Sequence, residues 1–199
     1  MAQRTPIQLI AGVGGACFLL FWPFVLGRRV PLLGWADLGF HELGHLVASP
    51  FGTVIHFLAG STTQVLVPIG LAGYFWLSQR DPLGTGLMLA WAATSLQDAS
   101  VYIGDAPYQR LPLIGGHHDW SFLLGRWHLI DEAAGIASMV WFIGLLSGLA
   151  ALETLAYPLL VRWNRARTAS TLARRFSDAP VREVRNPPKR ARGINRPGR

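Results

Sequence analysis

Residues 35–49 of the chain read WADLGFHELGHLVAS, an apolar segment with four ionisable side chains, Asp37, His41, Glu42 and His45. A proline and a glycine follow it and favour a helix that is short for a full membrane crossing. Ionisable residues are costly in a bilayer and almost always face a protein interior or a water-filled cavity. We therefore expect this helix to lie inside a bundle of other helices.

The composition of the whole chain indicates a membrane protein. Of its 199 residues, 51% are hydrophobic and 15% are charged, and the mean hydropathy is +0.31. A soluble domain of this size carries more charge, and a helix of roughly 20 apolar residues crosses a hydrocarbon core. Four longer apolar runs occur, at about residues 7–26, 62–78, 86–103 and 129–161. The sequence therefore predicts an all-α fold, a polytopic membrane helix bundle of about five apolar helices.

The C-terminal residues 162–199 have a different composition. They contain 12 of the 18 basic residues and two of the 11 acidic ones, and they are rich in Pro, Ser and Asn. Such a segment buries too little apolar surface to fold. We expect a transmembrane helical domain with a metal site at residues 1–161 and a disordered basic tail at residues 162–199. The tail is predicted to contact anionic lipid headgroups, and no specific nucleic acid is expected as a partner.

The basic residues that flank the apolar runs predict an orientation. Arg28, Arg29, Arg80 and the tail fall on one side of the bilayer if the five helices alternate. Basic residues concentrate on the cytoplasmic side. We therefore expect an integral protein of a bacterial cytoplasmic membrane, with its C-terminus in the cytoplasm and its N-terminus outside. A re-entrant second helix would invert the part of the chain that precedes it.

His41, Glu42 and His45 form an HExxH motif. On a helix, histidines at positions i and i+4 point to the same face, where both imidazoles can reach one Zn²⁺. Glu42 would lie close to a metal-bound water and serve as the catalytic base. Cys17 is the only cysteine, so any further ligand must be a histidine or a carboxylate. The alternative is that hydrogen bonds within a helix bundle satisfy both histidines.

A catalytic zinc site usually has three protein ligands and one open position. Asp98 and Tyr102 lie on one face of the predicted helix 86–103. With a rise of 1.5 Å per residue, Asp98 reaches about the depth of the histidines if both helices start at the same membrane face. We therefore predict Asp98 as the third metal ligand, with His118 as the alternative if residues 111–116 fold back into the bundle. The other candidate ligands are His56, Asp105, His117, Asp119 and His128.

Three polar residues are predicted to support the ligands or to hold a tetrahedral oxyanion: Gln64, Tyr102 and Asp119. Asp98 also has an alternative role, a structural hydrogen bond to Gln64 on the preceding helix. In that case Asp98 would not bind the metal.

The HELGH sequence inside an apolar helix, followed by two further apolar helices with an intramembrane aspartate, resembles the site-2 protease family of intramembrane zinc metalloproteases. The resemblance covers about residues 35–105. It implies His41 and His45 as ligands, Glu42 as base and, by its place in the helix order, Asp98 as third ligand. The chain departs from the family pattern because the aspartate lies in SLQDAS, not in LDG or NPDG, and no PDZ-like insertion occurs. The GSTTQ, SLQDASVYIGDA and HHDW segments also resemble uncharacterised bacterial membrane proteins.

The sequence thus predicts a zinc metallopeptidase that hydrolyses a peptide bond in or near the bilayer, with a membrane protein or peptide as substrate. Two alternatives stay open. One is a zinc-dependent membrane lipid or amide hydrolase, which would use the same metal chemistry. The other is a non-catalytic metal-binding membrane protein, in which Glu42 would have no role.

Overall fold

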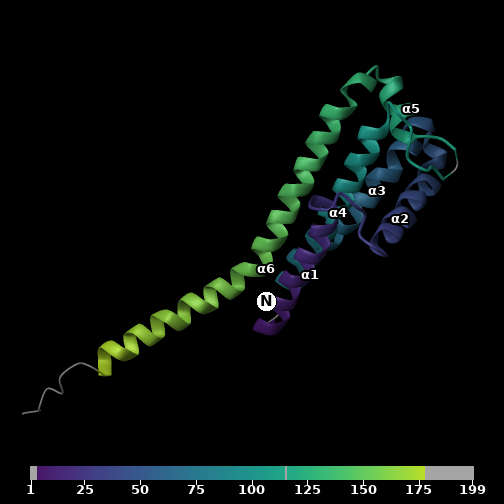
Figure 1. The fold of residues 1–199 in the computed structure, drawn as a ribbon. Helices are drawn as coiled ribbons and strands as arrows, with labels where there is room; N and C mark the ends of the chain where they lie inside the picture. The colour runs from purple at the N-terminus through teal and green to yellow at the C-terminus, as the bar shows by residue number, and fades with distance from the viewer. Residues whose placement is uncertain (1–3, 115, 178–199) are drawn as a thin grey trace, which may run out of the picture. The chain divides into compact units, whose positions relative to one another are not determined.

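A computed structural model describes residues 4–114 and 116–177 of the chain (Figure 1). The chain divides into two compact units, Met1–Arg162 and Trp163–Arg199, which are described separately. Helices and turns make up the described residues, which contain no strand. The prediction of an all-α fold is confirmed.

Six α-helices occur in the described part of the chain. They are α1 (Pro6–Phe24), α2 (Leu33–Ala48), α3 (Thr53–Tyr74), α4 (Pro82–Asp105), α5 (Asp119–Arg126) and α6 (Ala133–Ser177). Single helical turns occur at Ser49–Phe51, Phe75–Gln79 and Ile130–Glu132. Three stretches are long and apolar enough to cross a membrane, Pro6–Phe24, Thr53–Gln79 and Ile130–Arg174. The prediction of about five apolar helices is therefore not confirmed, because α2 is short and α4 falls outside this group.

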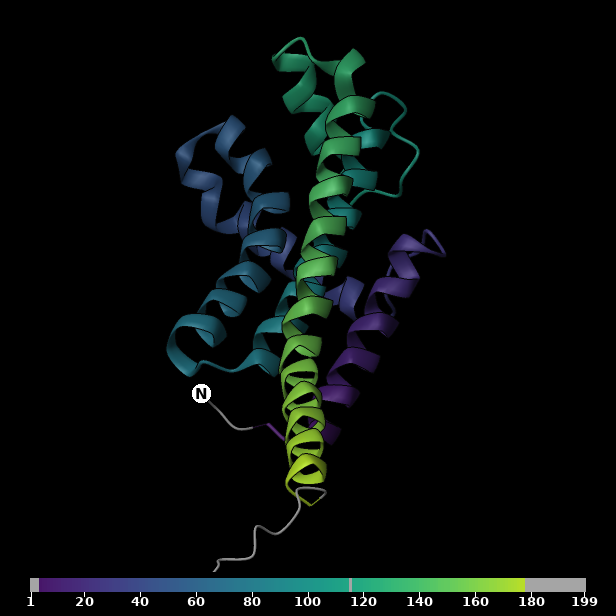
Figure 2. The ribbon, with the colours of Figure 1, turned by 90° about the vertical axis from the view of Figure 1, so that its left-hand side faces the viewer.

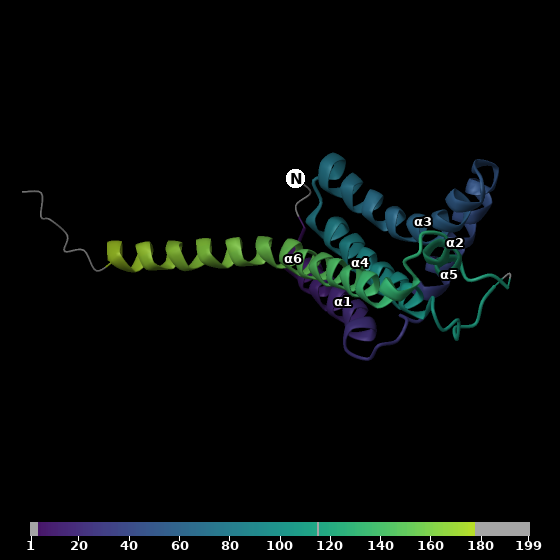
Figure 3. The same cartoon turned by 90° about the horizontal axis from the view of Figure 1, so that it is seen from above.

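Small residues allow the helices of the first unit to pack closely. α4 lies between α1 and α3 (Figure 3), and α2 packs against α3. Gly12 of α1 faces the side chains of Leu83 and Leu155. Around this contact, Ala16, Ala90, Ala151 and Leu155 form a fully buried cluster. Close approach of small residues is a common way for apolar helices to associate in lipid.

Arg4, the α3–α4 turn and Arg162 lie together at one end of the first unit. The guanidinium of Arg4 makes an ion pair with Asp81, with 2.9 Å between Nε and Oδ1. Arg162 donates a hydrogen bond of 2.7 Å to the carbonyl oxygen of Arg4. Figure 2 shows the start of α1 and the α3–α4 turn at the same end of the bundle. Alternation of five helices predicts that the N-terminus and residue 162 lie at opposite ends of the bundle. In the structure, Arg4 and Arg162 lie at the same end, so this prediction is wrong.

The difference arises because α2 starts partway along α4. Asp37, in the first turns of α2, accepts hydrogen bonds of 2.8 Å from Trp91 and Ser95, which lie in the middle of α4. Arg29, between α1 and α2, makes an ion pair with Asp98. α1 and α2 therefore follow one another along the bundle. This is the arrangement that a re-entrant second helix would produce.

The second unit is described over residues 163–177, which form the C-terminal part of α6. Within it, the guanidinium of Arg167 lies over the ring of Trp163, 4.5 Å from the centroid. The expected disorder from residue 162 is therefore not confirmed, because alanine, arginine and leucine in this stretch favour a helix. Residues 178–199 of the predicted tail fall outside the described residues.

Candidate metal centre

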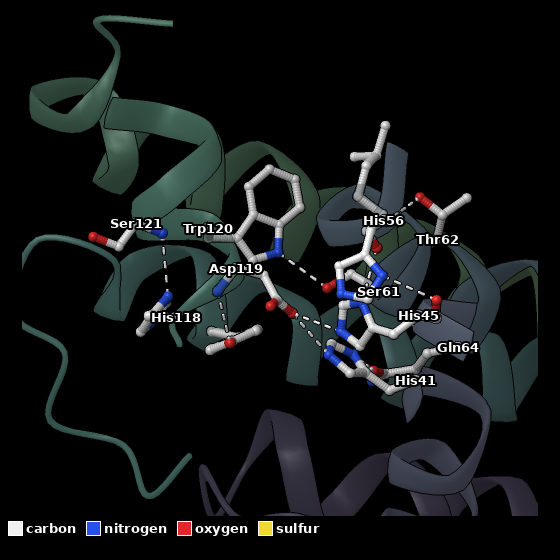
Figure 4. Close-up of polar contacts among 12 residues, drawn as sticks. His41, His45, His56, Ser61, Thr62, Gln64, His118, Asp119, Trp120 and Ser121 are labelled. Atoms are coloured by element: carbon white, nitrogen blue, oxygen red, sulfur yellow. Dashed lines mark hydrogen bonds and ion pairs between the residues drawn. The ribbon is translucent and has the colours of Figure 1, made fainter. Parts of the chain in front are cut away.

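Two histidines of α2 and an aspartate of α5 meet in the first unit (Figure 4). The Nε2 atoms of His41 and His45 lie 2.9 and 3.1 Å from one atom, Oδ2 of Asp119. The three ligand atoms lie within 4.8 Å of one another. His41 and Asp119 are buried, and His45 is partly buried. This group could bind a metal ion.

Hydrogen bonds on the opposite side of each ring indicate which nitrogen carries the proton. Nδ1 of His45 lies 2.8 Å from the carbonyl oxygen of His56, which can only accept, so Nδ1 donates. Nδ1 of His41 lies 3.3 Å from Oε1 of Gln64 and donates to it in the same way. In a neutral imidazole, Nε2 then has a lone pair. Both lone pairs face the Asp119 carboxylate, an arrangement that a cation between them would stabilise.

Gln64 of α3 is oriented by Asp98 of α4. The amide nitrogen of Gln64 lies 3.1 Å from Oδ2 of Asp98 and 3.4 Å from the backbone oxygen of Ser95, so it donates to both. Its Oε1 is therefore left to accept from His41. Arg29 makes an ion pair with the other oxygen of Asp98. Partners of this kind fix the tautomer and the orientation of histidines that bind metals.

Asp98, the predicted third ligand, is not brought to the two histidines. Its oxygens contact Arg29 and Gln64, and the ligand group contains Asp119 in its place. Asp98 and His41 both contact Gln64, but Arg29 and Gln64 hold the Asp98 carboxylate away from the histidines. The alternative role of Asp98, a hydrogen bond to Gln64, is present in the structure.

The segment that carries Asp119 folds back onto α3 and α4. The backbone amide of Asp119 donates to the hydroxyl of Tyr102 at 3.1 Å. Nε1 of Trp120 donates to Oγ of Ser61 on α3 at 3.0 Å. These contacts hold the start of α5 against α3 and α4, where the Asp119 carboxylate meets the two imidazoles.

His118, the alternative third ligand, has its ring nitrogens elsewhere. Nδ1 accepts a hydrogen bond of 3.2 Å from the amide of Ser121, and Nε2 lies 3.5 Å from Oδ2 of Asp105. Burial lowers the pKa of His118, which favours the neutral ring. The chain thus returns to α4 at His118, whose ring lies against Tyr102 and Asp105, although residues 112, 114 and 116 are exposed. The neighbouring aspartate, and not His118, joins the two histidines.

The other predicted histidines lie outside the ligand group. His56 and His45 are linked reciprocally, since Nδ1 of His56 lies 3.0 Å from the carbonyl oxygen of His45. His117 is exposed and stacks on Phe57. His128 follows α5 with a positive φ of 56°. Among the described residues, one group of this kind, His41, His45 and Asp119, was found.

A cavity of about 700 Å³ opens beside the histidines. Glu42, which is exposed on α2, lines this cavity together with His41 and His45. Apolar side chains from the two neighbouring loops and the start of α2 form much of the wall: Leu32, Trp35, Leu113 and Ile114. Apolar walls with a few convergent polar groups are typical of ligand and substrate sites. The Glu42 carboxylate can therefore meet molecules that enter the cavity.

Gly60 of α3 leaves space beside the ligand atoms. A Cβ atom at this position would lie 2.5 Å from Nε2 of His45 and 2.7 Å from Nε2 of His41, closer than real Cβ contacts. Gly60 is not among the residues predicted from the sequence. A local signal for it exists, because Gln64 follows four residues later and the two positions share one face of a helix.

We expect Gly60→Ala to weaken zinc binding by about 10-fold or more, because the methyl group would press on both ligand nitrogens. Gly70→Ala is the matched control, since a Cβ at Gly70 in the same helix would meet nothing within 4 Å. Both changes raise helix propensity equally. Titration of the bound zinc with a chelator compares the two variants, and equal affinities would contradict the role of Gly60.

In comparisons with protein-family models, curated proteins and solved structures, no match to the chain was found. Function is therefore argued from the geometry and chemistry of the site itself.

Proposed function

We propose that the protein is a zinc-dependent intramembrane metallopeptidase. The observation that carries the proposal is the convergence of His41, His45 and Asp119 on one point, beside Glu42 in an HExxH helix. Two imidazoles and one carboxylate are a donor set of catalytic zinc sites. Calcium and magnesium prefer sites built from oxygen atoms, so the two imidazoles favour zinc over both.

The residues around the centre have separable roles in this proposal. When bound, zinc would lower the pKa of a water molecule towards about 7 and polarise the scissile carbonyl. Glu42 would accept the proton of the attacking water and pass it to the leaving amine. Gln64 and His56 hold the two imidazoles in the tautomer that presents Nε2. Tyr102 lines the cavity, and we assign its hydroxyl to the oxyanion, because Gln64 already donates within the bundle.

We place the protein in a bacterial cytoplasmic membrane. Arg4 and Arg162 lie at the same end as the α3–α4 turn, which contains Arg80. The excess of basic residues makes this the cytoplasmic end. The metal centre, beside the last turn of α4, would then lie towards the outer face. Basic residues after position 162 would contact anionic lipid headgroups, and no role in nucleic-acid binding is proposed.

Cysteine labelling of intact cells checks this orientation. In a Cys17→Ser background, His117→Cys should react with a membrane-impermeant maleimide added outside the cells. Residue 117 is exposed and lies just before α5, at the end of the bundle that is proposed to face outwards. Ser170→Cys should react only after the cells are lysed. The reverse pattern would place the metal centre towards the cytoplasm.

The substrate class is tested in vesicles. The apolar walls of the cavity also suit an acyl chain, so a lipid or amide hydrolase is the second candidate function. Proteoliposomes should cleave members of a quenched fluorescent library of transmembrane peptides, and a chelator should stop cleavage until zinc is restored. Release of fatty acid without peptide cleavage would favour the second candidate. If protein that holds zinc released neither cleaved peptide nor fatty acid, both candidate functions would be contradicted.

A further inference from the structure

We propose that His118 is a positioning residue, which holds the Asp119 carboxylate at the metal ion without binding the ion itself. The inference rests on the proposed metal centre and explains how its third ligand, Asp119, is held in position. The His118 side chain is fully buried, with 0% of its surface exposed. Its contacts join the start of α5 to the last turns of α4.

The first contact is the cap of α5. His118 precedes Asp119, the first residue of the helix, and its Nδ1 accepts the hydrogen bond from the amide of Ser121. α5 is eight residues long, and an isolated helix of fewer than about 12 residues is marginal in water. Its shape and orientation therefore depend on its cap and its contacts with neighbouring helices.

The second contact is with Tyr102 on α4. The two rings stack with centroids 4.3 Å apart and an angle of 29° between their planes. The hydroxyl of the same tyrosine accepts the hydrogen bond from the Asp119 amide. One side chain of α4 thus contacts two successive residues at the start of α5, the ring of His118 and the backbone of Asp119.

The third contact is with Asp105 in the last turn of α4. Nε2 of His118 carries the remaining proton and lies 3.5 Å from Oδ2 of Asp105, and it makes no hydrogen bond within the described residues. The carboxylate of Asp105 accepts hydrogen bonds of 2.9 Å from the amides of Arg110 and Leu111. Asp105 therefore contacts both the first half of the connection between α4 and α5 and the last residue of that connection.

Loss of the His118 ring would let the start of α5 shift while the ligand atoms of α2 stay in place. Metal ligands must be held within about 0.5 Å of their geometry. A displaced Asp119 would bind the ion less well, although its own side chain is unchanged. Residues that orient metal ligands typically cost about 10–100-fold in affinity when removed.

The test compares zinc affinity, by chelator competition, in full-length protein in detergent. His118→Ala should bind zinc about 10–100-fold more weakly than the wild type. His118→Asn should recover part of the loss, because asparagine also caps helices through a side-chain acceptor. His117→Ala is the matched control, since its exposed ring stacks on Phe57 and not on α4, and it should bind zinc as the wild type does.

Amide hydrogen exchange separates positioning from a general loss of structure. In zinc-loaded His118→Ala, the amides of α5 should exchange faster than in the wild type, while those of α3 and the first turns of α4 should not change. Wild-type zinc affinity in His118→Ala, or an equal loss in His117→Ala, would overturn the proposal. So would loss of all zinc in His118→Ala with retention in Asp119→Ala, which would make His118 the ligand. A wild-type chain without zinc would instead remove the metal centre itself.

Discussion

Asp119→Ala should remove most of the zinc from the purified protein, with an affinity loss larger than the 10–100-fold typical of residues that only orient ligands. The reason is that Oδ2 of Asp119 is the oxygen on which both Nε2 atoms converge, at 2.9 and 3.1 Å. Asp98→Ala should fall within the 10–100-fold range, because Asp98 acts on His41 through Gln64. Chelator titrations of both variants rank the two losses.

The matched control for these titrations is Asp131→Ala. Asp131 is an exposed carboxylate in the turn before α6 and lies outside the ligand group. Its removal should leave zinc affinity unchanged. If Asp98→Ala lost more zinc affinity than Asp119→Ala, the third ligand would not be the aspartate of α5.

Glu42→Gln should keep zinc and lose about 10²–10⁴-fold in the rate of peptide cleavage. The amide has nearly the shape of the carboxylate but cannot accept the proton of the attacking water. The side chain of Glu42 is exposed on α2, so the change should leave the fold intact. The rate is measured in the proteoliposome assay with the same peptide for wild type and variant.

Glu153→Gln provides the control for charge alone, because Glu153 is an exposed glutamate on α6. It should cleave at the wild-type rate. Near-normal cleavage by Glu42→Gln would remove the proposed base, and zinc retention in the same sample would leave a metal-binding protein whose chemistry does not use this carboxylate.

The histidine pair could be predicted because its geometry is local. Two residues four positions apart on a helix share a face whatever the rest of the chain does. The alternative hydrogen bond between Asp98 and Gln64 was also foreseen, since two buried polar residues on neighbouring helices tend to pair.

The third member of the ligand group depends on contacts that are distant in sequence. Asp119 reaches His41 across 78 positions, and no local pattern indicates that α5 docks on α3 and α4. The relative depth of α2 and α4 could not be derived either. It depends on the connection between α1 and α2, which places Asp37 beside Trp91 in the middle of α4. α5 itself, at eight residues, is shorter than the periodic segments that sequence patterns detect well.

The metal content of detergent-purified protein tests the central claim most directly. Elemental analysis of the wild-type chain should find about one zinc ion per chain, because two imidazoles and a carboxylate complete the protein ligands of one catalytic site. The same analysis of the double variant His41→Ala, His45→Ala should find almost none, in protein that retains its helical circular dichroism. Equal zinc in the two proteins would contradict the account.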